Sequence, residues 1–361
     1  MDKIIKNVLK CIEDAGYEAY LVGGFVRDYL LGIKSLDVDI CTNALPKELH
    51  KLFPNNSNSN TYGGFKLKIK NYNIDITTYR KELKYDNRKP TEIVYLNNLE
   101  DDIVRRDFTI NSVCMNKDEK IIDLVGGIED INKKEIRMLG NIKERLTEDP
   151  LRILRAIRFS CVLNFNINSD LEKEIKDNYK LVDTLSNTRI KQELNKILLN
   201  KNYLKGLELL KEYKILDILE ISYDDISYVN DICGMWAQLN TTKNYAFTKQ
   251  EITNIINIRQ IINENVINNK VLYKYGLYNS LVAGEILNIP KKVINNIYNK
   301  LPIKSEKDLQ ITNNEIIEVL NIEPSKLLKD IKLELIELIL DGKLKNRNSE
   351  LKKYILKRKE M

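Results

Sequence analysis

Histidine is almost absent from this chain of 361 residues, in which His50 is the only one. A Ser-His-Asp triad, or a metal-dependent phosphohydrolase site rich in histidine, would have to use it. His50 lies in a polar, lysine-bearing segment with the pattern of a helix. We therefore interpret it as a structural residue, and the sequence argues against histidine-based catalysis.

Paired cysteines and long apolar runs are also lacking. The five cysteines are far apart and form no Cys-x-x-Cys pair, which argues against a zinc site or a disulfide framework and predicts buried, reduced thiols. No window of 18 apolar residues exists, so we expect no membrane span. Residues 1–6 resemble the start of an amphipathic helix rather than a signal peptide, and we predict a cytoplasmic protein.

The net charge of +6 says little by itself about nucleic acid, but its distribution is informative. Residues 341–361 contain eight Lys or Arg against three Asp or Glu. This segment is either a solvated helix end or a patch that follows phosphates.

The pattern of apolar residues divides the chain near Gly140. Before it, short β-like runs alternate with turns after a helix at 4–15, which predicts a mixed α/β catalytic domain; the runs lie at 20–22, 37–41, 65–69, 74–78, 92–95 and 110–115. After it, apolar spacing of three and four predicts helices at 146–163, 169–185, 188–199 and 203–219, and a helical remainder. The fold class is therefore α+β.

The most informative stretch joins two glycines to two carboxylates. Residues 21–28 read Leu-Val-Gly-Gly-Phe-Val-Arg-Asp, an apolar strand that runs into a helix start, and Asp37 and Asp39 follow. Alternate residues of a strand share a face, so both carboxylates point the same way. Gly23 and Gly24 allow close approach of a ligand, and a helix start favours an anion. An isolated Asp-x-Asp is usually a solvated turn, but this context indicates a phosphate cradle beside a metal site.

Two carboxylates on one strand suit Mg²⁺, which prefers oxygen ligands. Asp75, in Asn-Ile-Asp-Ile-Thr-Thr-Tyr-Arg, alternates on a strand that is able to lie beside the first and would add a third carboxylate. The alternative for Asp75 is an exposed acid on a strand.

A second polar constellation is Arg-Arg-Asp-Phe-Thr-Ile-Asn at 105–111. Arginine forks bind phosphates or ribose oxygens, and Asp or Asn side chains bind ribose hydroxyls. A surface cluster of ion pairs is the alternative interpretation.

The third constellation is Glu-Asp-Pro-Leu-Arg-Ile-Leu-Arg-Ala-Ile-Arg at 148–158. Pro150 suits the first turn of a helix and Asp149 its cap. Asp149, Arg152, Arg155 and Arg158 recur every three residues on a broad face, and nearby acids in register do not pair all three arginines. An Asp beside an Arg offers one acceptor and one donor fork, which matches the pairing edge of C or A and not that of G or U.

These motifs, in this order over about the first 165 residues, resemble the class II nucleotidyltransferases, specifically the bacterial CCA-adding enzymes and their poly(A) polymerase relatives. The resemblance implies a DNA polymerase beta-like head at 1–140, a helical neck at 141–200, a helical body at 201–280 and a tRNA-binding tail at 281–361. It implies template-independent, two-metal addition of C, C and A to the 3′ end of tRNA from CTP and ATP, without an obligatory protein partner.

The resemblance also assigns roles to single residues. Asp37 and Asp39 match the metal-binding carboxylates, and Asp75 stands where many relatives have Glu. Gly24 and Arg27 match contacts to the triphosphate, and Arg106 matches the arginine of a ribose-reading motif. Asp149 with Arg152 match the protein template for CTP and then ATP, and Arg155 and Arg158 match further nucleotide-site arginines.

One segment bears on the product. Residues 84–90, Lys-Tyr-Asp-Asn-Arg-Lys-Pro, resemble the flexible loop that CCA-adding enzymes keep and CC-only enzymes lack, although an ordinary hairpin loop is the alternative. We expect the chain to add all three nucleotides. The alternatives are a poly(A) polymerase or an A-adding enzyme of the same class and, more remotely, a non-catalytic RNA-binding protein.

Overall fold

The computed structural model describes residues 1–54, 58–59, 64–86, 89–322 and 326–359. The chain forms two compact units, Met1–Leu219 and Glu220–Met361. Each is described by itself.

The first unit begins with a mixed sheet, as the sequence predicts. Its strand order is β3-β4-β5-β2-β1-β8-β9, and only the central pair β2 and β5 is parallel. The strands are β1 (Ala19–Val22), β2 (Asp37–Thr42), β3 (Asn58–Ser59), β4 (Gly64–Ile69), β5 (Tyr72–Thr78), β8 (Cys114–Met115) and β9 (Ile121–Ile122). A separate hairpin pairs β6 (Arg80–Asp86) with β7 (Lys89–Tyr95).

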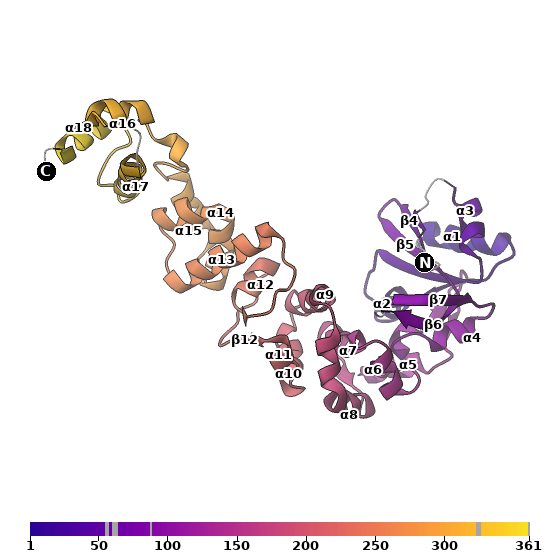
Figure 1. Ribbon diagram of the computed structural model, residues 1–361. Coiled ribbons are helices and arrows are strands. Elements are labelled where there is room, and N and C mark those ends of the chain that lie inside the picture. The colour runs from indigo at the N-terminus through magenta and orange to yellow at the C-terminus, as the bar shows by residue number, and fades with distance from the viewer. Residues whose placement is uncertain (55–57, 60–63, 87–88, 323–325, 360–361) are drawn as a thin grey trace. The chain divides into compact units, whose positions relative to one another are not determined.

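Five short helices accompany this sheet (Figure 1). They are α1 (Lys3–Asp14), α2 (Gly24–Leu30), α3 (Pro46–Leu52), α4 (Leu99–Val104) and α5 (Gly127–Lys133). Helix α1 buries Ile5, Val8, Leu9 and Ile12, whose spacing of three and four forms one apolar stripe. On α3, His50 packs edge-on against Phe65 with ring centroids 5.1 Å apart, in keeping with a structural role.

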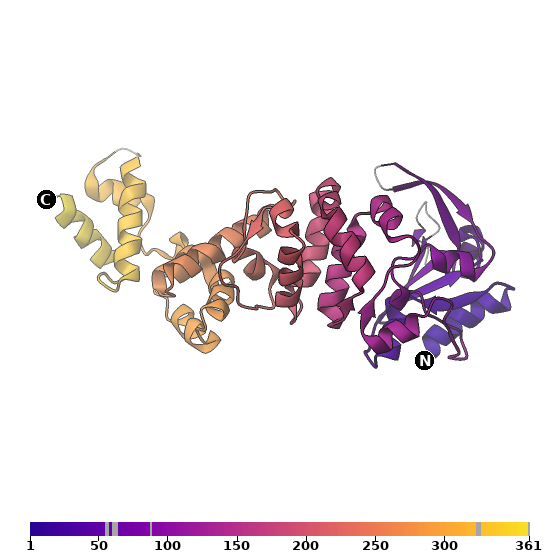
Figure 2. The same ribbon diagram turned by 90° about the horizontal axis from the view of Figure 1, so that it is seen from below.

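Helices alone follow, apart from the two-residue pair of β10 (Glu135–Ile136) and β11 (Asn166–Ile167). They are α6 (Ile142–Glu148), α7 (Leu151–Leu163), α8 (Ser169–Asn178), α9 (Asn187–Leu198), α10 (Tyr203–Glu212) and α11 (Ile215–Leu219). Helix α7 packs against α9 and α10 and buries apolar residues on most of its surface. Figure 2 shows the strands gathered around the N-terminus and these helices, in magenta, beside them.

Some predicted elements are divided. The helix expected at 146–163 is two helices, because Pro150 has no backbone N–H to continue α6 and Asp149 adopts an extended conformation. The strand expected at 110–115 is a 3₁₀ turn, Thr109–Asn111, followed by β8. The segment 169–185 ends in a 3₁₀ helix, Tyr179–Thr184, and 203–219 is interrupted at Lys214, whose φ is +57°.

The second unit is helical, with one short pair of strands, β12 (Ile221–Ser222) and β13 (Asn240–Thr241). Its helices are α12 (Ile232–Ala237), α13 (Lys249–Glu264), α14 (Asn269–Ile286), α15 (Lys291–Asn299), α16 (Asn313–Leu320), α17 (Lys326–Leu340) and α18 (Asn348–Lys359). Some of the basic residues of 341–361 form ion pairs within this unit: Lys352 pairs with Glu315 at 2.8 Å, and Arg358 pairs with Glu334 at 2.7 Å.

The cysteines and the described helices agree with two further expectations. All five cysteines are free thiols, four of them buried, and burial raises the pKa of Cys161 to about 11. None of the described helices combines the length and apolar character that a membrane span needs.

The N-terminus of helix α5 packs directly against the 105–111 segment. Asp123 accepts hydrogen bonds from the backbone N–H of Ile128 at 2.8 Å and of Gly127 at 2.9 Å. Burial of Asp123 acts to raise the pKa of its carboxyl, but these hydrogen bonds hold that pKa below its ordinary value. Gly127 lies against the backbone of Thr109: a Cβ at position 127 would stand 2.3 Å from the Thr109 carbonyl oxygen. Only glycine permits this approach.

Replacement of Gly127 by alanine should therefore destabilise the first unit by about 1–3 kcal/mol, because backbone rather than a flexible side chain must move. Urea denaturation measures the change. Glu129→Ala in the same helix is the matched control, since it removes an exposed ion pair with Lys133 and should change stability far less. Equal effects of the two substitutions would contradict this packing.

Candidate nucleotide-binding site

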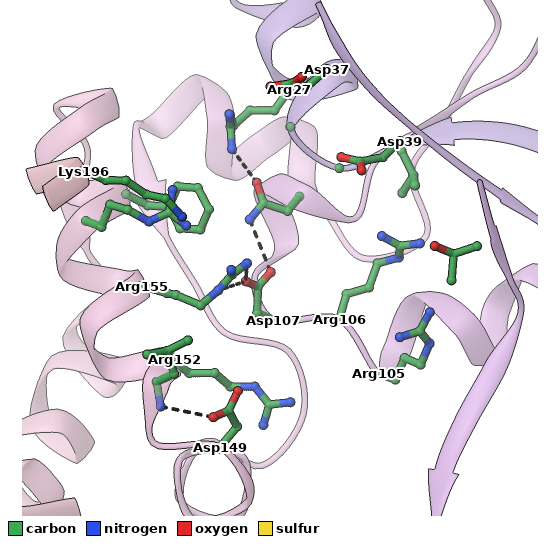
Figure 3. A pocket seen from close by; sticks show the side chains of 18 of the residues that line it. Arg27, Asp37, Asp39, Arg105, Arg106, Asp107, Asp149, Arg152, Arg155 and Lys196 are labelled. Carbon is green, nitrogen blue, oxygen red and sulfur yellow. Dashed lines mark hydrogen bonds and ion pairs between the residues drawn. The ribbon is translucent and has the colours of Figure 1, made fainter. Parts of the chain in front are cut away.

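One cavity of about 750 Å³ lies in the first unit and collects nearly all the predicted site residues. Gly24, Arg27, Asp37, Asp39, Arg106, Asp149, Arg152, Arg155 and Arg158 line it. Asp75 is the exception: its side chain is not part of the lining, and it pairs with Lys66 at 3.1 Å. Figure 3 shows the two carboxylates on one side, the α7 arginines on the other, and Arg106 with Asp107 between them.

The carboxylate side is built by β2. Asp37 and Asp39 share a face of this strand, and the parallel partner β5 places Asn73 opposite Asp37 and Asp75 opposite Asp39. The Asn73 amide donates to Asp37 Oδ1 at 3.0 Å. Burial raises the pKa of Asp39 above its ordinary value, and the nearby charges of Asp75 and Asp37 also raise it. Like charges held together in this way are the condition that a bound cation relieves.

Gly23 has a specific reason to be glycine. Its φ is +75°, and a Cβ there would stand 2.6 Å from Asp39 Oδ2. The glycine thus makes room for a carboxylate of the protein itself, whereas the sequence suggested room for a ligand.

The 105–111 segment stands between the two sides. Asp102 on α4 has a completely buried carboxylate and accepts from Arg105 Nε at 2.7 Å and from Arg106 Nη2 at 2.9 Å. The guanidinium of Arg145 on α6 donates to the backbone carbonyls of Arg105 and Arg106. This segment is therefore held from both neighbouring helices.

A chain of hydrogen bonds crosses the cavity wall from α2 to α7 (Figure 3). Arg27 Nη1 donates to Asn111 Oδ1 at 2.6 Å, and the Asn111 amide donates to Asp107 Oδ1 at 3.3 Å. Arg155 Nε donates to Asp107 Oδ2 at 2.8 Å. Burial opposes ionisation of Asp107, yet Arg155 beside it holds the pKa of that carboxyl below its ordinary value.

The three arginines of α7 are all paired, but only Arg152 uses a nearby acid in register, as expected; Arg155 and Arg158 pair with acids that are distant in sequence. Arg152 pairs with Glu148 at 3.2 Å, one turn earlier in sequence, and Arg158 donates to Glu193 at 2.5 Å. Asp149 accepts from the backbone N–H of Leu151 at 3.3 Å and from Arg189 at 3.3 Å, but the N-cap of α7 is Pro150 rather than Asp149 as predicted.

The sequence interpretation missed several lining residues. Arg189 and Lys196 line the cavity from α9, and Phe159 lines it from α7. A signal for the α9 residues was present, because Arg189, Glu193 and Lys196 are spaced by four and three and so share a helix face. No group of three or more His, Cys, Asp or Glu with metal-site geometry occurs among the described residues, so the carboxylates at β2 form a pair.

Residues 84–86 and 89–90 belong to the paired strands β6 and β7, and residues 87 and 88 lie outside the described residues. The bearing of this segment on the product stays a prediction.

Comparisons with known proteins agree with this geometry. The Poly A polymerase head domain matches residues 19–137, the probable RNA and SrmB-binding site of polymerase A matches 164–223, and a putative domain 2 of tRNA nucleotidyltransferase matches 237–355. The CCA-adding enzyme of Ligilactobacillus salivarius is 31% identical over 94% of this chain and 92% of its own length. The chain belongs to the CCA-adding enzymes.

Other members are similarly related. The CCA-adding enzyme of Bacillus cytotoxicus is 29% identical over 96% of both chains. The Bacillus stearothermophilus CCA-adding enzyme, solved in complex with CTP, superposes with a TM-score of 0.88 at 23% identity and covers 100% of this chain and 98% of its own. The α+β fold inferred for a CCA-adding enzyme is thus confirmed, and the chain is a nucleotidyltransferase.

Asp39 should lower the free energy of unfolding of the protein when the cavity holds no ligand. The pKa of this carboxyl is higher in the folded state than in the unfolded chain. The group therefore lowers the free energy of unfolding as the pH rises above the pKa that it has in the unfolded chain. Asp39→Asn should therefore raise the free energy of unfolding at pH 7 in metal-free and nucleotide-free buffer. The gain should shrink at acid pH, where the wild-type carboxyl is also neutral.

Urea denaturation at several pH values measures this difference, with Asp118→Asn, an exposed carboxylate outside the cavity, as the control. A variant less stable than the wild type at pH 7 would contradict the prediction.

Proposed function

We propose that this chain adds C, C and A to the 3′ end of tRNA without a nucleic-acid template, with CTP and ATP as substrates. The observation that carries the proposal is the placement of a carboxylate pair and an arginine-bearing helix on opposite sides of one cavity. The first serves nucleotidyl transfer, and the second serves nucleotide selection.

We propose that Asp37 and Asp39 hold the divalent ion, that this ion is Mg²⁺, and that Asp75, whose charge lies beside Asp39 on the neighbouring strand, serves the catalytic site without ligating the ion. The residues fit such an ion, because they supply hard oxygen donors and because burial, together with the nearby charges of Asp75 and Asp37, raises the pKa of Asp39. When bound, Mg²⁺ supplies Lewis-acid activation of the attacking hydroxyl and neutralises triphosphate charge.

The remaining residues bind and orient the nucleotide. Gly24 and Arg27 contact the triphosphate, Arg106 contacts the ribose, and Arg155 and Arg158 complete the cationic wall. Each arginine keeps donors to spare, because a guanidinium has five N–H groups and its protein partners use only some of them.

Asp149 and Arg152 select the base. The Asp149 carboxylate has about four acceptor sites, and its partners Leu151 and Arg189 use two, so it remains able to accept from the exocyclic amino group of C or A. Arg152 is held by the Arg145 carbonyl at 2.5 Å and by Glu148, which fixes the direction of its fork toward a ring nitrogen. Preorganised donors and acceptors discriminate because a mismatched base leaves them unpaired.

For the whole chain, we propose the head, neck, body and tail at 1–140, 141–200, 201–280 and 281–361. The basic residues of 341–361 that remain outside the ion pairs of α18 would contact tRNA phosphates, which position the substrate without reading its sequence. The proposed substrate, tRNA, favours a cytoplasmic location.

The activity is tested with purified protein, tRNA lacking its CCA end, and each nucleotide alone or together, followed by sequencing of the 3′ ends. We expect C, C and A in order with both nucleotides. Failure to use CTP would indicate a poly(A) polymerase or an A-adding enzyme. Asp37→Ala should abolish addition and leave tRNA binding intact, which excludes a protein that only binds RNA.

Loss of the Arg152 fork should relax base selection. Arg152→Ala should lower the ratio of kcat/KM for CTP over UTP by roughly 5- to 150-fold, since one discriminating hydrogen-bonded contact contributes about 1–3 kcal/mol. Arg137→Ala is the control, because Arg137 pairs with Asp130 outside the cavity. Unchanged selectivity of Arg152→Ala would remove this residue from the template role.

A further inference from the structure

An aromatic ring lies among the arginines of the cavity. Phe159, on α7, lines the cavity and is 6% exposed. The guanidinium carbon of Arg158 lies 3.9 Å from the centroid of its ring, that of Arg27 lies 5.3 Å away and that of Arg155 lies 5.5 Å away. All three fall within the range of about 6 Å over which a cation is attracted to the negative face of an aromatic ring.

A contact between the arginines and an aromatic ring is favourable here because cationic side chains outnumber carboxylates in the cavity lining. Nine cationic side chains line the cavity against four carboxylates. Additional carboxylates would reduce the repulsion among the cations, but they would also repel a triphosphate. An aromatic face attracts cations through its quadrupole without adding net negative charge. It therefore holds arginines together and leaves their charge available to the nucleotide.

The ring is fixed where the two parts of the first unit meet. Phe108, from the 105–111 segment, is completely buried and packs edge-on against Phe159 with centroids 5.6 Å apart. Arg27 comes from α2, whereas Arg155 and Arg158 come from α7 itself. The same guanidinium groups donate hydrogen bonds to Asn111, Asp107 and Glu193. One ring thus contacts the phosphate-side arginine and the neck arginines together.

We propose that Phe159 is a positioning residue, which holds Arg27, Arg155 and Arg158 in the nucleotide-binding arrangement through the negative face of its ring. This inference rests on the proposed function, since the nucleotide is what the three arginines contact. Because the effect acts through arginines rather than on the base, it applies to CTP and ATP alike.

The test separates the ring's quadrupole from its shape. Mono-, di- and trifluorinated phenylalanine, introduced at position 159 of the full chain through a suppressed codon, weaken the negative face stepwise with little change in size. The dissociation constants of CTP and ATP are measured without tRNA, together with KM and kcat for addition. The same series at Phe108, which does not line the cavity, is the matched control.

We expect both nucleotides to bind progressively more weakly across the series at 159, by roughly 3- to 30-fold in total, with constant unfolding midpoints and no comparable trend at 108. A flat series at 159, an equal decline at 108, or unfolding midpoints that fall in step with affinity would overturn the positioning role and leave the proposed function intact. An unfluorinated protein that binds neither nucleotide would overturn both.

Discussion

Mutual repulsion among cations is the constraint on which the first unit depends. Nine Lys and Arg side chains surround a single cavity, and each must be held against its neighbours in the absence of substrate. The protein meets this constraint with carboxylate partners that are themselves buried in the protein. Asp102, Asp107 and Glu193 are largely buried and bind the guanidinium groups from behind. The donors that remain point to the space that a polyanion would fill.

These partners join parts of the chain that are far apart in sequence. Asp107 binds an arginine 48 residues later, and Asn111 binds one 84 residues earlier. A buried ion pair of this kind contributes little net stability, because desolvation of both charges opposes their attraction. Its effect here is on geometry: Asp107 and Asn111 bind arginines of α7 and α2 and so hold these helices in one defined arrangement with the 105–111 segment. The cavity therefore exists only after the sheet has packed together with α7 and α9.

The sequence predicts those features that a local period determines. The alternation of β2 places Asp37 and Asp39 on one face, and the helical period of α7 places Arg152, Arg155 and Arg158 along one side of the cavity. Residue types that match a known family then supply the chemistry. Three features required tertiary contacts and were missed: the pairing of Arg155 and Arg158 with distant acids, the position of Asp75 outside the cavity lining, and the close approach of Gly23 to Asp39.

Without a ligand, one side of the cavity favours the binding of a cation and the other side favours the binding of an anion. On one side, burial and like charge hold the pKa of Asp39 above its ordinary value, so an added cation is favoured there. On the other side, the arginines exceed their partners, so an added anion is favoured. A free divalent ion satisfies only the first demand, and a metal-free nucleotide satisfies only the second while it brings negative charge toward Asp37 and Asp39. A nucleoside triphosphate with its divalent ion satisfies both at once, since its cationic and anionic parts are held at a fixed separation. The arrangement of charge therefore favours the metal-bound form of the nucleotide as the species that binds, whichever base it carries.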